Sequence, residues 1–507
     1  MKASPIVSNT KQAIWVGISQ LSSFLLAIVS AAILARYFDK TEYGTYKQIL
    51  YIYYTLLVLF SAGLQGAYSY FLPKQTMEQG KDFVYNLIKV FLILGAGYSL
   101  SLFLLAPVIS DIFNNPELTK GLRIFSIVPV LILPTIGIEG VYATLRKTHV
   151  IAIYTTFTRI LMLVLITMPV VLFKGTYITA IYGWIASSLI TCAFAIYLIL
   201  SPFRKVSRHP TMFNYKQILK YSLPLMVATV YGILIRFADQ FFISRYYGAE
   251  VFAEFSNGFI DLPFISIISG ATVTVLLPLF SKYNETSSGK KNIGQTWKSA
   301  TERSVMIAYP LLAFFAFNAK SSVIALYGEQ YSVSAVYFII GMLIGYFNII
   351  VFQTVLFALG KTRVYARIHL IQALLIWIVG YTVVYFSGSP IAYAILSRVF
   401  YVGQVCAGIW YAAKILGIKV NDILPLRIML KVAVHSSLIC GFTGLVAGTF
   451  IPNPFLALVL SAVFSGALVL FTGDFFGIHY KEMAKTLLAN TPGFSSFATK
   501  WRKVDNV

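Results

Sequence analysis

Apolar segments of 20 or more residues recur along the chain from Ala13 to Phe476, separated by short clusters of charged residues, glycine, proline and asparagine. A helix of this length crosses about 30 Å of hydrocarbon. Phe24–Leu34 and Ile160–Leu172 are almost continuously apolar, whereas the strands of a membrane barrel alternate polar and apolar residues. Because only helices and closed barrels satisfy their backbone in lipid, the pattern predicts an all-α polytopic membrane protein.

These segments predict about fourteen membrane spans, arranged as six, six and two. A polar stretch, Ser201–Lys220, separates the first two blocks, and the last two spans precede a polar C-terminal tail. We predict an N-terminal lobe over 1–203, a C-terminal lobe over 204–416, accessory helices over 417–480 and a tail over 481–507. The predicted spans lie near 13–36, 45–72, 84–108, 121–145, 150–173, 177–201, 221–246, 251–281, 300–319, 333–359, 364–386, 390–413, 427–450 and 455–476.

The composition agrees with this class, since 58% of the residues are hydrophobic and only 11% are charged, against about 25% charged in soluble domains. The first apolar run continues from Lys11 to Arg36, too long for the core of a signal peptide, and is expected to be the first span. Cys192, Cys406 and Cys440 lie in apolar segments without paired spacing, which favours neither disulfides nor a metal site. No nucleotide-binding motif is visible, so we predict no cofactor and no metal.

The basic residues identify an orientation in the membrane. The chain carries 40 Lys and Arg against 18 Asp and Glu, a formal net charge of +22. If the N-terminus is cytoplasmic, most basic residues fall in the cytoplasmic segments, alternating loop by loop as the positive-inside rule requires. We therefore predict a multi-pass protein of the bacterial inner membrane with both termini cytoplasmic. This distribution accounts for the basic excess through membrane lipids and excludes a nucleic-acid partner.

A weak internal repeat relates the two blocks of six spans. A shift of 209 residues places Arg36-Tyr37-Phe38 on Arg245-Tyr246-Tyr247, Tyr43 on Phe252 and Tyr46 on Phe255. Both copies follow a span that leaves the membrane on the outer side, which predicts a parallel repeat about an axis along the membrane normal. Arg36, Tyr43, Gly44 and Arg245 are the predicted repeat and gate motif. The alternative is that arginine and aromatic residues form an interfacial anchor belt.

The sequence around these positions resembles a known family, the polysaccharide transporters of the multidrug/oligosaccharidyl-lipid/polysaccharide (MOP) superfamily, often called Wzx-type flippases. One departure is Phe252-Ala253, where the family usually repeats a glycine after the aromatic residue. The segments that carry the resemblance are Ile33–Phe38, Glu42–Tyr46, Gly63–Leu64, Tyr70–Pro73, Asp239–Ile243 and Tyr246–Gly248.

The resemblance implies both a fold and an activity. The fold would be two six-helix lobes in a V around a central cavity, with two additional helices at the C-terminus. The activity would be a flippase that moves undecaprenyl-pyrophosphate-linked oligosaccharide, such as an O-antigen or capsule unit, to the outer leaflet by alternating access through a cationic cavity. Its partners would be this substrate, membrane lipids and other glycan-assembly membrane proteins, and the protein would be a monomer.

Charged residues inside predicted spans are the strongest candidates for the site, because charge is costly in hydrocarbon and usually faces a bundle interior or water. We rank Arg159 and Arg398 first, since no acidic residue lies within four positions of either and arginine binds phosphate through two donors. Arg236 is three residues from Asp239 and is expected to bind substrate or to pair with that carboxylate. The further candidates are Lys89 as a cavity cation and Glu139, Asp239 and Asp261 as coupling or pairing carboxylates.

Three other functions stay open at this point. A multidrug and toxin extruder has the same architecture but favours an acidic cavity for cationic drugs. A flippase for lipid-linked peptidoglycan precursors differs mainly in the sugar. A membrane glycan polymerase would be an enzyme and would need a sizeable external loop, whereas the longest predicted one, Ser110–Lys120, offers only Asp111 and Glu117. We therefore predict a transporter rather than an enzyme.

Overall fold

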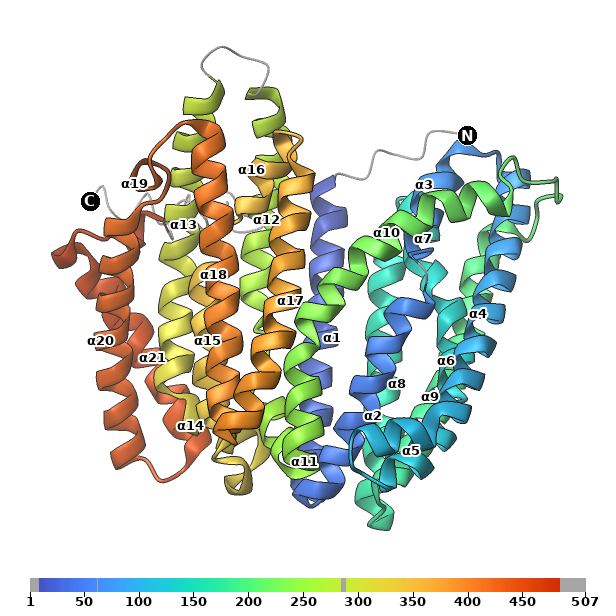
Figure 1. Ribbon diagram of the computed structural model, residues 1–507, viewed down its shortest axis with the longest axis horizontal. Helices are drawn as coiled ribbons and strands as arrows, with labels where there is room; N and C mark the ends of the chain where they lie inside the picture. Colours follow the sequence, from blue (N-terminus) through green and yellow to red (C-terminus); the bar gives the residue numbers. More distant parts are fainter. Residues whose placement is uncertain (1–8, 62, 284–288, 484–507) are drawn as a thin grey trace, which may run out of the picture. The chain divides into compact units, whose positions relative to one another are not determined.

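The computed structural model of the chain describes residues 9–61, 63–283 and 289–483, and the secondary structure of this part is entirely helical (Figure 1). The prediction of an all-α membrane protein is confirmed. The helices up to residue 258 are α1 (Asn9–Tyr37), α2 (Lys40–Phe60), α3 (Gln65–Phe71), α4 (Met77–Ile112), α5 (Glu117–Phe125), α6 (Val128–Ile132), α7 (Gly137–Thr144), α8 (Thr148–Phe173), α9 (Tyr177–Leu200), α10 (Tyr215–Arg236) and α11 (Ala238–Gly258).

The helices after residue 258 follow the same pattern of long and short segments. The short 3-10 turns are Leu72–Lys74, Leu133–Ile136, Ser201–Phe203, Glu329–Tyr331 and Gly473–Phe476. The α-helices are α12 (Pro263–Tyr283), α13 (Gly289–Phe317), α14 (Ala319–Tyr327), α15 (Ser334–Asn348), α16 (Phe352–Ala358), α17 (Thr362–Ser387), α18 (Pro390–Leu416), α19 (Val420–Ile423), α20 (Leu426–Phe450) and α21 (Pro454–Thr472).

Within the described residues, 12 helical segments are long and apolar enough to cross a membrane, or 13 if α13 and α14, bent by 70°, count as one span. The predicted span near 221–246 is the exception, because it falls on α10 and the first part of α11 and neither is among these segments. The predicted accessory spans are α20 and α21. The tail beyond residue 483 lies outside the described residues.

Several predicted spans are broken helices, which their apolar composition did not reveal. The span near 45–72 breaks between α2 and α3, where Gly63 has φ +66, a conformation that glycine adopts without strain. The span near 121–145 consists of α5, α6, a 3-10 turn and α7, with Pro129 and Pro134 in the first positions of their turns. Proline removes a backbone donor and clashes with the preceding turn, which favours a break or a kink in the helix at these positions.

The chain forms two compact units that do not follow the chain order: Met1–Asn257 with Leu326–Gly328 and His369–Ser397, and Gly258–Ala325 with Glu329–Ile368 and Arg398–Val507. The lobe boundaries at 203 and 416 stay a prediction. In the first unit, α8 packs against α1 and α9, and α4 packs against α5 and α6. Its core contains Tyr53, Tyr98 and Trp184, with the Tyr98 hydroxyl donating to the Tyr53 carbonyl at 2.7 Å.

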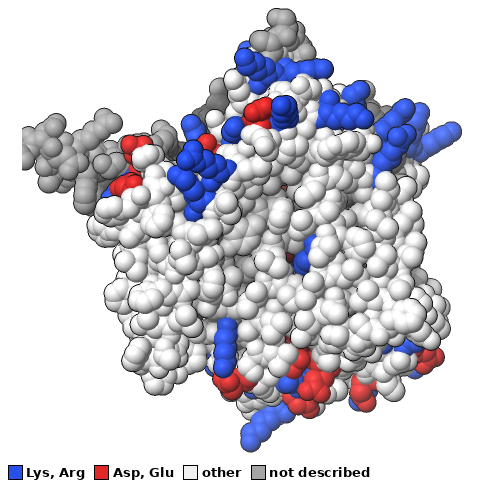
Figure 2. All heavy atoms as spheres, turned by 60° about the vertical axis from the view of Figure 1, so that its left-hand side comes forward, with Lys and Arg blue, Asp and Glu red and all other residues white. Residues whose placement is uncertain are grey.

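The second unit is organised around α13, which packs against α12, α15, α19 and α20, while α20 packs against α21. Its core includes Trp297, Phe280 and Leu416, all almost completely buried. Figure 2 shows that charged side chains gather near the ends of the helices on the face in view, with mostly uncharged side chains along their lengths. Such a surface suits helices that cross hydrocarbon with their ends in water.

Candidate functional site

The two copies of the predicted repeat motif pack directly against each other in the first unit. The start of α2 crosses α11 so closely that a Cβ atom at Gly44 would collide with the carbonyl of Ala249. Only glycine leaves room for this approach of two backbones. Tyr43 and its repeat counterpart Phe252 are both buried, as are Tyr46 and Phe255.

Polar side chains connect the two helices at this crossing. The Lys40 ammonium donates to the Glu254 carboxylate at 2.6 Å and lies 3.5 Å from Glu250. The Tyr43 hydroxyl donates to Asn257 at 2.9 Å. The amide of Gln48, which is fully buried, donates to the Ser244 hydroxyl at 2.8 Å. We refer to this set of contacts between α2 and α11 as the α2–α11 contact.

The arginines of the motif lie at the turns that precede these contacts. Arg36, in the last turn of α1, donates from Nε to the Leu326 carbonyl at 3.0 Å. The guanidinium of Arg245 lies 5.7 Å from the ring centroid of Tyr246. Gly248, with φ +82 and ψ −179, bends α11 between Arg245 and the second half of that helix, a backbone conformation essentially restricted to glycine. The predicted boundary between spans seven and eight coincides with this bend.

Lys40, Glu254 and Gln48 were not predicted as site residues. Glu254 could have been found, because it is an acidic residue near the start of the predicted span 251–281. Its partner Lys40 is more than 200 residues away in the sequence, and no local pattern links the two. Their pairing follows from the packing of α2 on α11.

Arg159 lies half-buried near the middle of α8, a helix that qualifies as a membrane span. Its Nη1 donates to the Met162 sulfur at 3.9 Å, and a thioether is a weak acceptor. Its charge also interacts with Tyr53 and Tyr154. Within the described part of the chain no carboxylate pairs with Arg159, so its charge is not neutralised by a side chain there.

Arg398, in α18, is half-buried in the second unit and stacks its guanidinium on the ring of Phe259, with 3.6 Å between the guanidinium carbon and the ring centroid. A cation at this distance from a ring is stabilised by the negative face of the aromatic system. The Phe259 contact could not be predicted, because the two residues are far apart in the sequence.

The other predicted cations and carboxylates lie in different surroundings. Lys89 is exposed on α4, and Glu139, exposed on α7, accepts a hydrogen bond from Gln65 at 3.4 Å. Arg236 is the last residue of α10 and is exposed, whereas Asp239 is buried in α11 and accepts from the Tyr393 hydroxyl at 3.4 Å. Phe237, which ends α10 between these two residues, keeps helical backbone angles, and the pairing of Arg236 with Asp239 stays a prediction.

Asp261 lies between α11 and α12, in the non-helical residues that precede Pro263, and is exposed. The sequence pattern placed it inside the predicted span 251–281, but the structure divides that span into two helices. Metal binding has no obvious location, since no three His, Cys, Asp or Glu residues of the described ranges come together as a metal site.

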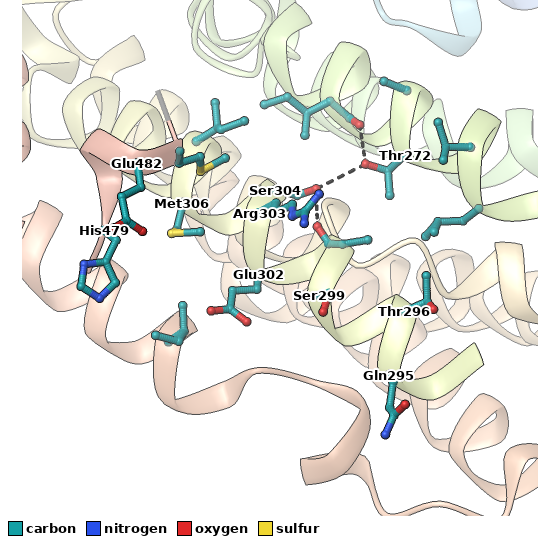
Figure 3. A pocket seen from close by; sticks show the side chains of 18 of the residues that line it. Thr272, Gln295, Thr296, Ser299, Glu302, Arg303, Ser304, Met306, His479 and Glu482 are labelled. Atoms are coloured by element: carbon teal, nitrogen blue, oxygen red, sulfur yellow. Dashed lines mark hydrogen bonds between the residues drawn. The ribbon is translucent and has the colours of Figure 1, made fainter. Parts of the chain in front are cut away.

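A cavity of about 1030 Å³ lies in the second unit between α12, α13 and the segment that follows α21 (Figure 3). One wall is apolar and consists mainly of α12 residues such as Ile267, Val275 and Leu279. The other carries Glu302 and Arg303 from α13, and His479 and Glu482 also line the cavity. Thr272 and Ser304 join α12 to α13 through their hydroxyls at 3.3 Å. The cavity is therefore amphipathic.

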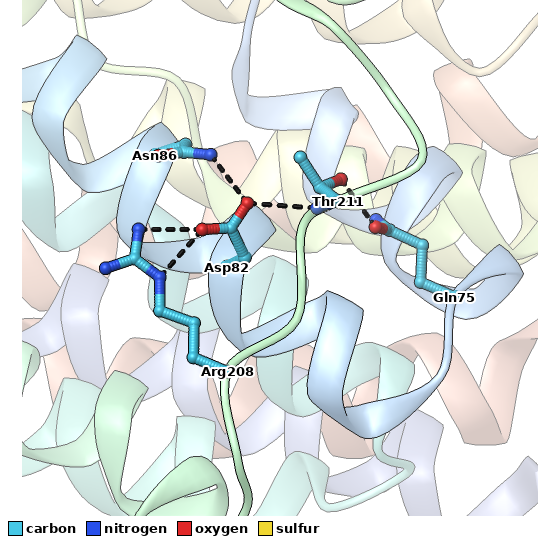
Figure 4. Close-up of polar contacts among 5 residues, drawn as sticks. All are labelled: Gln75, Asp82, Asn86, Arg208 and Thr211. Carbon is cyan, nitrogen blue, oxygen red and sulfur yellow. Dashed lines mark hydrogen bonds and ion pairs between the residues drawn. The ribbon is translucent and has the colours of Figure 1, made fainter.

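A second polar network fixes the loop between α9 and α10 to the start of α4 (Figure 4). Asp82 accepts from the Arg208 guanidinium at 2.7 Å and from the Thr211 backbone and the Asn86 amide, each at 3.0 Å. The Thr211 hydroxyl donates to Gln75 at 2.6 Å. Asp82 thus satisfies donors from both segments and determines the path of the loop.

We expect Asp82→Asn to release this loop, because the neutral amide loses the charge-assisted bonds, which are roughly twice as strong as neutral ones. Limited trypsin digestion of the purified protein should cleave after Arg204, Lys205 or Arg208 about tenfold faster than in the wild type, since cleavage follows the population of the open segment. Asp111→Asn removes an exposed carboxylate that makes no side-chain hydrogen bond or ion pair within the described residues, and it should leave the rate unchanged. Equal rates for the two variants would contradict the prediction.

Comparison with known proteins identifies the family. The family described as polysaccharide biosynthesis protein matches residues 10–284 of the 507, more than half of the chain. The chain belongs to this family. Its membership confirms the resemblance seen in the motifs between Ile33 and Gly248. No curated protein matches the sequence.

Solved structures show that this family member has the fold of MOP superfamily transporters. The lipid II flippase MurJ in an inward closed conformation has a TM-score of 0.69 at 16% identity, covering 91% of this chain and 99% of that one. An inward-facing multidrug resistance MATE transporter has a TM-score of 0.64 at 13% identity, covering 80% and 98%. A MOP transporter from Pyrococcus furiosus, described as having a binding pocket of reverse polarity, has a TM-score of 0.56 at 15% identity, covering 83% and 95%.

Proposed function

We propose that the protein is a flippase, not an enzyme, that moves a lipid-diphosphate-linked oligosaccharide, such as an O-antigen or capsule unit, across the bacterial inner membrane. The observation that carries this proposal is Arg159, a cation in the middle of a membrane-spanning helix with no carboxylate partner among the described residues. Membership in the polysaccharide biosynthesis family links the protein to glycan assembly. A charged site in a membrane transporter of this family fits an anionic lipid-linked substrate.

Arg159 supplies the chemistry that a diphosphate requires in the membrane. A charged group loses its hydration in hydrocarbon, at a cost of several kcal/mol. A guanidinium replaces water by donating two parallel hydrogen bonds to phosphate oxygens. The weak Met162 contact leaves these donors available, and we propose that Arg159 binds the substrate diphosphate. Arg398, whose guanidinium lies over the Phe259 ring, is proposed as a second phosphate-binding cation, with Arg236 and Lys89 as further contacts.

The amphipathic cavity of the second unit also fits an amphiphilic substrate. Its apolar α12 wall suits a hydrocarbon chain, and Arg303 at its polar side suits a phosphate. Both chemistries occur together in a lipid-linked diphosphate. We propose that this cavity holds the substrate at one stage of translocation.

We propose that the α2–α11 contact is the outward gate of an alternating-access cycle, as the repeat motif predicted. Its hydrogen bonds and ion pair involve groups that water can solvate when the contact opens, so opening exchanges these bonds for bonds to water at small net cost. Glu139, Asp239 and Asp261 stay proposals for coupling or pairing carboxylates. Asp239 is buried, and a buried carboxylate responds to changes in water access.

The runner-up is a multidrug extruder, which the MATE-like fold favours. An extruder of cationic drugs would not benefit from an unpaired arginine in a membrane helix, because like charges repel. Drug sensitivity therefore separates the two functions. Deleting the gene should leave resistance to cationic drugs unchanged if the protein is a flippase.

The direct test is translocation in proteoliposomes. Purified full-length protein in vesicles with undecaprenyl-diphosphate-linked oligosaccharide should make the glycan accessible to a membrane-impermeant glycosidase from the opposite leaflet, faster than protein-free vesicles do. Accumulation of the same lipid in the cytoplasmic leaflet after depletion of the protein in cells would agree. Vesicles that show no difference from the protein-free control, together with normal surface glycan in depleted cells, would reject the proposal.

A further inference from the structure

A cavity at the basic end of the second unit gathers lysines that the proposed transport function does not use. It has a volume of about 870 Å³ and is lined by Lys290, Lys291 and Lys298 of α13 and by Lys419. Asp422 is the one acidic residue among the described residues that line it. The positive-inside rule accounts for the number of lysines at this end of the helices but not for their convergence on one cavity.

Within the described residues, the cavity lining carries four lysines and one carboxylate, Asp422. Lys298 donates to the Asn421 carbonyl at 3.4 Å, and across the described ranges none of the four lysines forms an ion pair. Four ammonium groups facing one carboxylate repel each other, and a bound anion with several negative charges would relieve this repulsion. Lysine is a common phosphate ligand in proteins, acting as a point charge.

The wall of the cavity is built on a rigid base. Lys290, Gly294 and Lys298 are four residues apart along α13, so they lie on one face of the helix. Gly294 is buried, and a Cβ atom there would come within 3.0 Å of the Ile418 side chain. On the adjoining face Trp297 is fully buried with Leu416 in the core of the unit. The stretch of α13 that carries these lysines is therefore packed against the segment that carries Lys419, and both line the same cavity.

The cavity lies too far from the hydrocarbon for a lipid headgroup to fill it, which favours a soluble ligand. No charged residue follows Arg303 in α13, so the hydrocarbon begins near that residue. At 1.5 Å per residue, Lys298 lies about 8 Å and Lys290 about 20 Å beyond this boundary. The headgroup layer on each side is only about 5 to 8 Å thick, so most of the cavity lies in water.

We infer that this cavity binds a soluble diphosphate, such as inorganic pyrophosphate or the diphosphate of a nucleotide. Its volume falls in the range of about 300 to 1,000 Å³ that is usual for small-molecule sites. The described residues that line it include no aromatic side chain, so it offers no stacking platform for a base. Recognition is by the diphosphate charge. The inference does not rest on the proposed flippase activity.

The test is calorimetric titration of the full-length protein in nanodiscs of neutral phosphatidylcholine at fixed ionic strength. Inorganic pyrophosphate should bind with one site per chain and about tenfold more tightly than inorganic phosphate. Changing all four cavity lysines, Lys290→Gln, Lys291→Gln, Lys298→Gln and Lys419→Gln, should weaken pyrophosphate binding at least about tenfold. Asp422→Asn should tighten binding, because it removes the one opposing charge.

A matched control removes four exposed positive charges outside the cavity: Lys205→Gln, Lys216→Gln, Lys361→Gln and Arg363→Gln. Its affinity should stay within about twofold of the wild type at an ionic strength that screens distant charges. Absence of wild-type binding, or an equal loss in this control, would overturn the inference. Nanodiscs that contain anionic phosphatidylglycerol test whether lipid headgroups occupy the cavity instead. If the wild-type protein binds pyrophosphate in these nanodiscs only as weakly as the quadruple cavity variant does, the lipid headgroups compete for the cavity, and the site would be assigned to them.

Discussion

Arg159→Ala should reduce surface glycan to a few per cent of the wild-type level while the protein stays in the membrane in normal amounts. Removing one partner of a desolvated charge pair costs about 2 to 5 kcal/mol, and each 1.4 kcal/mol corresponds to a tenfold change. The folded protein should lose little, because within the described residues Arg159 makes a weak hydrogen bond to Met162 and pairs with no carboxylate. The defect should therefore appear in transport and not in folding.

The measurement is glycan display in a strain that depends on this protein, with its membrane level followed by immunoblot. Arg159→Lys keeps the charge but loses the bidentate geometry, so it should show intermediate glycan. Arg363→Ala is the matched control, since Arg363 is exposed at the start of α17 and should behave like the wild type. If the Arg159→Ala strain displays normal amounts of glycan, Arg159 is not part of the substrate site. If the variant protein is lost from the membrane, Arg159 has a structural role.

Gly44→Leu should nearly abolish glycan display by preventing the α2–α11 contact from closing. A side chain at this position collides with the Ala249 carbonyl, and a backbone atom cannot move aside as a flexible side chain can. Overpacking of this kind costs about 1 to 3 kcal/mol or more. Because the cost arises where two helices touch, the helices should separate while each stays folded.

Ser244 reports this separation, since its side chain is fully buried at the contact and bonded to Gln48. With Ser244→Cys as a background, a membrane-impermeant maleimide should label the Gly44→Leu protein several-fold faster than the parent, in proportion to the open population. Gly97→Leu is the matched control, because a Cβ atom at Gly97 meets no neighbour within 4 Å. If the Gly44→Leu and Gly97→Leu proteins are labelled at the same rate in the Ser244→Cys background, Gly44 does not hold the contact closed.

The candidate site was predictable only where a residue is unusual in its own surroundings. Arg159 and Arg398 stand out in the sequence because each interrupts an apolar run without a nearby acid, and the structure leaves Arg159 without a carboxylate partner in the part it describes. Arg236 and Asp239 were grouped by their spacing, which assumes one continuous helix. The structure places the end of α10 at Phe237, between the two residues, and their pairing stays a prediction.

The sequence by itself determined the class of the protein, its helical content and most of its membrane spans. The free energy of transferring a segment to lipid depends on the apolar residues of that segment and can be judged locally. The sequence also determined the family, through motifs around Arg36 and Gly248 whose residues lie next to one another in the chain. Tertiary structure alone decided how Lys40 meets Glu254 and which lysines surround one cavity. These features depend on contacts between helices distant in sequence, and such contacts are selected by packing and close approach rather than by local hydrophobicity.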